Sequence, residues 1–169
     1  MDVKYFGFSI NTATNKIPLG NYFSYLSENS GFSNDSGPNE RLFYIDDSSD
    51  DYFKGLIVTV KDQKVYCKYS QNSGRVVIEV ENIGHNSKML DFNFFVIRKS
   101  NGIGLYQHYH QSCSLRGAGE YLKKYYRDYR KKLIDEAISV KINEKGSALD
   151  EKEEKQIRSN FKDQIEFAT

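Results

Sequence analysis

Short runs of strand-forming residues, spaced about ten residues apart, occupy the middle of this chain and limit the folds open to it. In order they are RLFYI, GLIVTV, KVYCKY, RVVIEV, FNFFVIRK and GIGLYQHYHQ, and together they extend from residue 41 to residue 111. Turn-forming segments such as QNSG and SNGI separate them. Short strands joined by tight turns pair with their neighbours, so this pattern predicts an antiparallel meander.

Helical segments are predicted on both sides of the meander. A first strand at Val3–Ser9 is followed by a short helix at Leu19–Glu28. From Gly117 onward apolar residues recur at steps of three and four, as on one face of a helix. We expect a break at Gly146 and then a second, highly charged helix. Its narrow apolar seam would consist of Ile157, Phe161 and Ile165.

These elements predict an α+β fold: an antiparallel sheet of five to seven strands, a short N-terminal helix and a C-terminal helix pair. A length of 169 residues suits one domain, with residues 1–115 forming the sheet region and residues 116–169 forming helices packed on it. The last helix shows no stop signal, so we expect a fragment of a longer protein. A charged helix with a thin apolar seam also suggests homo-oligomers formed through the C-terminal helices.

Charge and cysteine content limit the function classes. The net charge is +1, so any attraction to nucleic acid must come from a local patch. The chain has two cysteines, Cys67 and Cys113, no secretory leader, and no apolar run of about 18 residues. We therefore expect a cytoplasmic protein with reduced thiols and no membrane contact.

Positive charge gathers between Arg116 and Lys132, where seven basic residues accompany two acidic ones. A loop formed by Arg116-Gly117-Ala118-Gly119 would precede the helix, and free N–H groups at a helix start favour anions. The predicted binding residues are Arg116, Gly117, Gly119, Lys123, Lys124, Arg127, Arg130 and Lys131. Their partner would be DNA, RNA or another polyanion, with Tyr121 and Tyr125 placed to stack on a base. A solvated charged face and a surface for an acidic protein are the alternatives.

Asn101-Gly102 is the strongest hairpin signal in the chain, because a type I′ turn needs positive φ at both central positions. A two-residue turn there would pair Ile97 with Tyr106. Alternation of side chains would then place His108 and His110 on the same face as Tyr106, and Cys113 on the opposite face unless the strand ends before it.

The two histidines form a His-x-His pair, which can bind zinc if a third ligand is near. The predicted neighbours of His108 and His110 are mostly aromatic, so we expect a packed or surface face and no metal. A metal-dependent hydrolase using His108 and His110 is the less favoured alternative. The acidic run of Asp46, Asp47, Asp50 and Asp51 lacks the oxygen-ligand spacing of a calcium loop and predicts a solvated turn.

No set of acid, base and nucleophile is visible, and no phosphate-loop, Gly-x-Ser-x-Gly or His-Glu-x-x-His motif occurs. The sequence therefore favours a non-catalytic recognition domain that needs no cofactor and binds nucleic acid or another polyanion. A protein–protein sensing or oligomerisation domain is the alternative.

The run FFVIRKSNGIGLYQHYHQSCSL, residues 94–115, resembles the hairpin-then-helix passage of bacterial phage-exclusion and abortive-infection proteins of the Rex and Kiwa kind. The shared features are an aromatic strand, a turn, Ile103-Gly104, another strand and a helix. The resemblance implies a cytosolic sensor or DNA-contacting domain at the N-terminus of a larger defence protein, and it assigns no functional residue.

Overall fold

The computed structural model describes residues 2–34, 39–61, 65–72, 75–82, 84, 88–109 and 112–169. The helices are α1 (Leu19–Glu28), α2 (Leu115–Lys145) and α3 (Glu151–Asn160). The strands are β1 (Val3–Thr12), β2 (Phe32–Asn34), β3 (Asn39–Asp46), β4 (Tyr52–Lys61), β5 (Val65–Asn72), β6 (Arg75–Asn82), β7 (Met89–Arg98), β8 (Ile103–Tyr109) and β9 (Ile165–Ala168).

Seven strands form one antiparallel sheet in the order β2-β3-β4-β7-β8-β1-β9. The remaining two, β5 and β6, form a separate antiparallel ladder. The α+β prediction, with its N-terminal helix and C-terminal helices, is confirmed. The meander is interrupted, because β4 pairs with β7 and the hairpin between them leaves the sheet.

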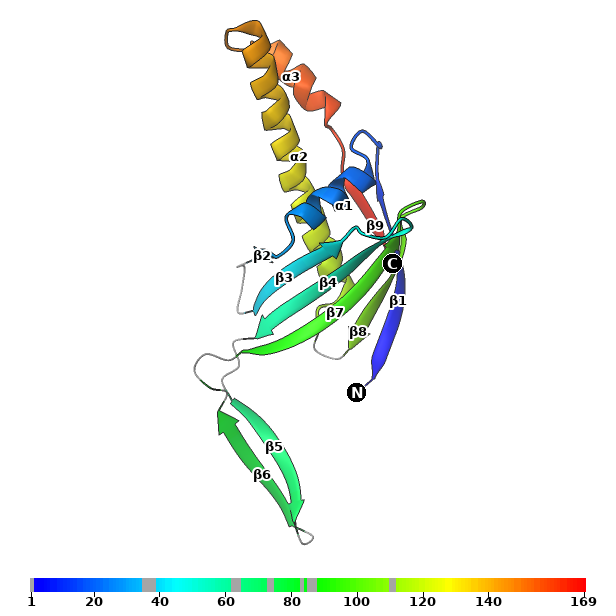
Figure 1. Ribbon diagram of the computed structural model, residues 1–169, viewed down its shortest axis with the longest axis vertical. Coiled ribbons are helices and arrows are strands. Elements are labelled where there is room, and N and C mark those ends of the chain that lie inside the picture. The colour runs from blue at the N-terminus through cyan, green and yellow to red at the C-terminus, as the bar shows by residue number, and fades with distance from the viewer. Residues whose placement is uncertain are drawn as a thin grey trace.

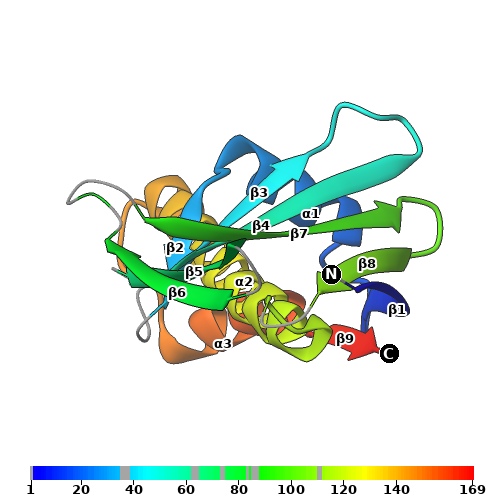
Figure 2. The same ribbon diagram turned by 90° about the horizontal axis from the view of Figure 1, so that it is seen from below.

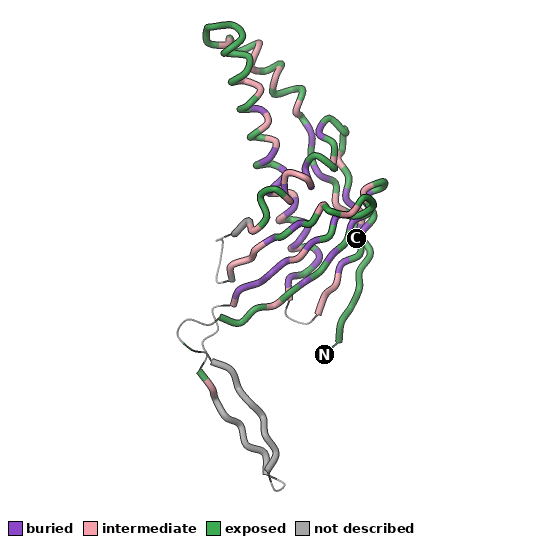
Figure 3. The backbone as a smooth tube through the Cα atoms, in the orientation of Figure 1, coloured by how far each residue is buried: buried purple, intermediate pink, exposed green. Residues whose placement is uncertain are grey.

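The sheet curves around α1 and the first half of α2, which lie on its inner face (Figures 1 and 2). The second half of α2 extends past the sheet with α3 beside it (Figure 1). The β5–β6 ladder projects from the ends of β4 and β7 on the opposite side of the molecule (Figure 1); we call it the arm. Buried positions gather in the sheet and the inner half of α2, and the outer half of α2 is mostly exposed (Figure 3).

Alternation along β7 shows why these residues form a sheet with one helix-covered face. Asn93, Phe95 and Ile97 are buried, and the residues between them are exposed. Phe95 lies across the ladder from Gly55, where an added Cβ would approach the Phe95 ring to 2.0 Å. A glycine is therefore required beneath this ring.

The apolar stripe of α2 packs on the sheet as predicted over its first half. Leu122, Tyr126 and Tyr129 are buried, and the Leu122 carbonyl accepts a hydrogen bond of 2.7 Å from the Tyr22 hydroxyl of α1. Further along, Val140 is 56 % exposed because the helix has passed the end of the sheet. The predicted break is confirmed at Gly146, which caps α2 with a φ of 67°.

The predicted last helix is too long. α3 begins at a capping box formed by Asp150 and Glu153, as expected of a charged helix, but it ends at Asn160. Phe161 caps α3, and Ile165 belongs to β9, where it is buried and pairs with Thr12 of β1. Residues 116–169 therefore contribute an edge strand to the sheet as well as two helices.

The predicted type I′ turn is also wrong. Asn101 does not have positive φ; Gly102 does, at 68°. The Asn101 side chain accepts a hydrogen bond from the Ile103 N–H, and the Gly102 N–H donates to the Arg98 carbonyl at 2.9 Å. These contacts form a four-residue connection, Lys99–Gly102, in which glycine alone takes the left-handed position.

Candidate polyanion-binding surface

The segment Arg116–Gly119 is the first turn of α2 and not a loop before it. Ser114 caps the helix, since its Oγ accepts a hydrogen bond of 3.1 Å from the Gly117 N–H. Gly119 is buried, and a Cβ there would lie 2.8 Å from the ring of Phe167 in β9. The two glycines thus allow capping and close packing, and Arg116 is the exposed part of this segment.

The other predicted basic residues are spread over α2 and do not form one uniform face. Lys123 and Lys124 are half-buried, and Lys123 forms an ion pair of 3.3 Å with Glu120. Lys131 is exposed on a surface that also carries Asp128 and Asp135. Neighbouring carboxylates or other partners therefore reduce the positive potential around these three lysines.

Arg127 and Arg130 lie one turn apart on α2. Arg127 is exposed. Arg130 borders a groove of about 400 Å³ between the two helices. The lining residues are Arg130, Ile134, Lys155, Arg158, Ser159, Phe161 and Lys162. Four of these are basic and none is acidic, so this groove, which we call the basic groove, concentrates positive charge.

The contacts around the basic groove hold its cations in place. Arg130 donates a hydrogen bond of 2.8 Å to the Asp163 backbone carbonyl. On α3, Lys155 pairs with Glu151 at 2.6 Å and Arg158 with Glu154 at 3.5 Å. Within the described part of the chain, neither Arg130 nor Lys162 forms an ion pair with a carboxylate.

Sequence reasoning missed the α3 half of this groove. Lys155, Arg158 and Lys162 are spaced by three and four residues, a spacing that would place cations on one face of a continuous helix. That spacing was a usable signal. What the sequence does not reveal is that the basic side of α3 faces Arg130 of α2.

Tyr121 and Tyr125 are packed against β3 and are not positioned to stack on a base. Both rings contact Phe43, with centroids 5.3 and 5.5 Å away, and the Tyr121 hydroxyl accepts a hydrogen bond of 2.6 Å from Arg41. Burial raises the pKa of Tyr125 to about 12, so this phenol stays neutral. The predicted stacking role for these two tyrosines is therefore wrong.

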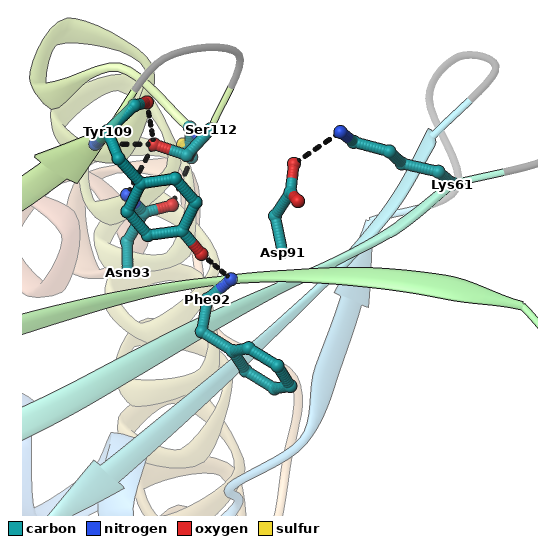
Figure 4. A network of polar contacts seen from close by, with 7 residues as sticks. Lys61, Asp91, Phe92, Asn93, Tyr109 and Ser112 are labelled. Atoms are coloured by element: carbon teal, nitrogen blue, oxygen red, sulfur yellow. Dashed lines mark hydrogen bonds and ion pairs between the residues drawn. The ribbon is translucent and has the colours of Figure 1, made fainter. Parts of the chain in front are cut away.

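The region of the histidines and Cys113 is organised around a buried amide. Asn93 donates to the Gln107 carbonyl and the Ser112 Oγ, and its Oδ1 accepts from the Cys113 N–H (Figure 4). In the same cluster the Phe92 N–H donates to the Tyr109 hydroxyl. The strand has ended at Tyr109, which allows Cys113 to return to the core on the side of Tyr106. The predicted placement of Cys113 on the opposite face is wrong for that reason.

This cluster offers no catalytic or metal-binding geometry among its described residues. His108 is half-buried and lies edge-on to Phe6 with ring centroids 5.9 Å apart, whereas His110 lies outside the described residues. Cys113 is a free thiol, 1 % exposed, and burial raises its pKa. Within the ranges that the structure describes, no group of three His, Cys, Asp or Glu side chains could hold a metal ion.

The acidic run forms a turn with local ion pairs. Asp46 pairs with Lys54 at 3.3 Å and Asp47 with Lys99 at 2.5 Å, while Asp51 is exposed. The Asp46 pKa is lowered to about 2, mainly by hydrogen bonds from Ser48. These contacts agree with a solvated turn.

Comparison with family models, with curated proteins and with solved structures finds no match to this chain. The resemblance of residues 94–115 to phage-exclusion proteins stays a prediction. Of the helices that the structure describes, none combines the length and the apolar character needed to cross a bilayer.

Proposed function

We propose that this chain is a non-catalytic recognition domain that binds a polyanion, with DNA or RNA as the polyanion. The basic groove carries the proposal, because it brings together four cations from α2, α3 and the segment that follows α3, without a lining carboxylate. Phosphate backbones are bound by positive charge gathered in one place, and a nearly neutral chain must supply that charge locally.

The groove suits a strand of phosphates better than a single small anion. Lys155 and Arg158 lie on α3 and Lys162 follows its end, so successive phosphates could each meet one cation. Arg127 and Arg116 would extend the contact along α2. No pattern of side chains for reading base edges accompanies them in the described residues, so weak sequence preference is expected.

A salt titration of binding to duplex and single-stranded DNA and RNA tests the proposal. The test variant carries Lys155→Gln, Arg158→Gln and Lys162→Gln. The matched control carries Lys4→Gln, Lys88→Gln and Lys152→Gln, which remove the same charge from exposed positions outside the basic groove.

Wild type and control should bind at low salt, and affinity should fall steeply as salt rises. The groove variant should bind more weakly, with a log–log slope smaller by roughly 0.7 to 0.9 for each phosphate that it no longer neutralises. Absence of binding by wild type at low salt, or equal binding by groove variant and control, would refute the proposal and favour a protein partner.

A further inference from the structure

The N-terminal half of β1 has a strand on one edge only. On that edge β8 pairs with β1 from Val3 to Ser9. On the other edge, among the described strands, β9 pairs with β1 only from Ser9 to Thr12. The stretch Val3–Gly7, whose second edge is left without a strand, is exposed at every residue (Figure 3). We call this stretch the open edge. The backbone N–H and C=O groups along such an edge are a template for pairing with another strand.

The side chains of the open edge give it little protection from pairing. Val3, Tyr5 and Phe6 are 44, 68 and 41 % exposed, although all three are large and mainly hydrophobic. Lys4 is the single charged residue of the stretch, which contains no proline. Sheets usually protect an edge strand with charges, a proline, a bulge or a covering segment. An edge that lacks most of these devices indicates that another strand covers it.

Gly7 supports the same conclusion, because packing within the chain does not require a glycine there. A Cβ at this position would meet no atom within 4 Å, and the φ angle of Gly7 is not positive. Glycine weakens a strand, and within a strand it often marks a place where another chain approaches closely. The space beside Gly7 is therefore available to a side chain from outside.

We propose that two copies of this chain form a dimer by antiparallel pairing of their open edges, about a two-fold axis that passes through Tyr5. The pairing joins the two seven-stranded sheets into one continuous sheet. It goes beyond nucleic-acid binding and is independent of it, because every residue that lines the basic groove lies in α2, in α3 or after α3.

The side chains of the open edge select this register. A two-fold axis perpendicular to the sheet keeps each face on its own side, so only residues of one face can lie opposite each other. An axis through Lys4 would place two lysines directly opposite, which is unfavourable. An axis through Phe6 would pair three residues of the open edge, Tyr5 to Gly7. An axis through Tyr5 pairs all five residues from Val3 to Gly7.

The register through Tyr5 also brings complementary side chains together. Tyr5 meets the Tyr5 ring of the second copy, and aromatic pairs across strands are favourable. Val3 lies opposite Gly7 and fills the space that the glycine leaves. Lys4 lies opposite Phe6, where its ammonium group can approach the face of the ring. A second copy therefore matches the open edge along its whole length, which a strand of unrelated sequence would do only by chance.

Light scattering of the whole chain over a concentration series tests the dimer, with a monomer mass of 19.6 kDa as reference. Two variants, Tyr5→Lys and Tyr5→Glu, each place like charges opposite each other at the two-fold axis. An equimolar mixture of the two variants places opposite charges there. The matched control, Tyr44→Lys, makes the same chemical change at an exposed tyrosine of β3, on the far side of the sheet.

Wild type and control should reach twice the monomer mass, and each Tyr5 variant alone should be a monomer with unchanged circular dichroism. The mixture should recover the dimer, which shows that the variants are folded and that Tyr5 lies at the axis. A monomeric wild type at the highest concentration would overturn the proposal and leave the open edge to a strand of another protein. A dimer that survives both variants, or that the control also loses, would place the interface elsewhere. A mixture that stays monomeric would overturn the register.

Discussion

A single buried amide, Asn93, joins the paired strands β7 and β8 to the segment at Ser112 and Cys113 that leads into α2. Its side chain makes hydrogen bonds of 3.0 Å to the Gln107 carbonyl, 2.8 Å to Ser112 Oγ and 3.0 Å from the Cys113 N–H. Because Asn93 is fully buried, no water can replace these bonds if the amide is removed.

We expect Asn93→Leu to lower the free energy of unfolding by about 3 kcal/mol, because it leaves buried backbone groups without partners. Urea unfolding followed by circular dichroism measures the change. Asn143→Leu, at an exposed position of α2, serves as the control and should change stability by less than about 0.5 kcal/mol. A loss below about 1 kcal/mol in Asn93→Leu would show that the amide bonds matter less than their burial suggests.

At the scale of elements, the sequence predicts the faces of strands better than their pairing. A two-residue turn predicts Ile97 opposite Tyr106, but Phe95 occupies that position. The error is two residues, because the turn has four residues in place of two. Side chains alternate with a period of two, so the shift leaves Phe95, Ile97 and Tyr106 on one buried face, as predicted.

The candidate site is predicted less completely than the fold. Periodicity locates the α2 helix and its basic residues, but it assigns Gly117 and Gly119 to a loop because glycine also marks loops. Packing against Phe167 explains Gly119, and only the tertiary structure reveals that contact. The meeting of α2 with the basic side of α3 is likewise a long-range contact that local spacing cannot specify.

The connection from β9 to the helical side depends on Asp163. Its carboxylate accepts hydrogen bonds from the N–H groups of Thr14 (3.0 Å), Ile17 (3.1 Å) and Gln164 (2.9 Å). Burial by itself would raise the pKa of Asp163, but these donors outweigh it and hold the pKa below the ordinary value of 3.8.

A carboxyl group whose pKa is lowered in the folded state stabilises the fold at pH values above its ordinary pKa. This contribution is lost as the pH falls from the ordinary pKa through the folded-state pKa. We therefore expect Asp163→Asn to be less stable than wild type by about 2 kcal/mol at pH 7, with a smaller difference at about pH 3. Urea unfolding at the two pH values measures both. Asp135→Asn, at an exposed position, should show no such dependence, and a gap in Asp163→Asn that stays constant with pH would contradict this role.

At the scale of the whole molecule, stability should be uneven. β4 and β7 lie in the centre of the sheet with a partner on each side, whereas α2 beyond Ile134 is largely exposed. Amides in the central strands should exchange with solvent only on global unfolding, and those of residues 135–145 through local fraying.

Hydrogen exchange followed by mass spectrometry should show the end of α2 exchanging roughly tenfold or more faster than β4 and β7. Repeating the measurement on the Asn93→Leu variant provides the control, because it should speed exchange in the central strands and leave the end of α2 unchanged. Equal protection across both regions would mean that the projecting helices unfold together with the sheet.

The pairing of β9 with β1 has a consequence for how the chain folds as it is synthesised. β1 is the first of these strands to leave the ribosome, and the strand that closes its edge, at Ser9 to Thr12, is made after α2 and α3. Until then Phe8 lacks the ring of Phe167 that stacks on it 5.1 Å away. The edge of the sheet at β1 therefore stays open until both helices have been made. A nascent chain halted before Ile165 would leave that edge free to pair with any nearby strand.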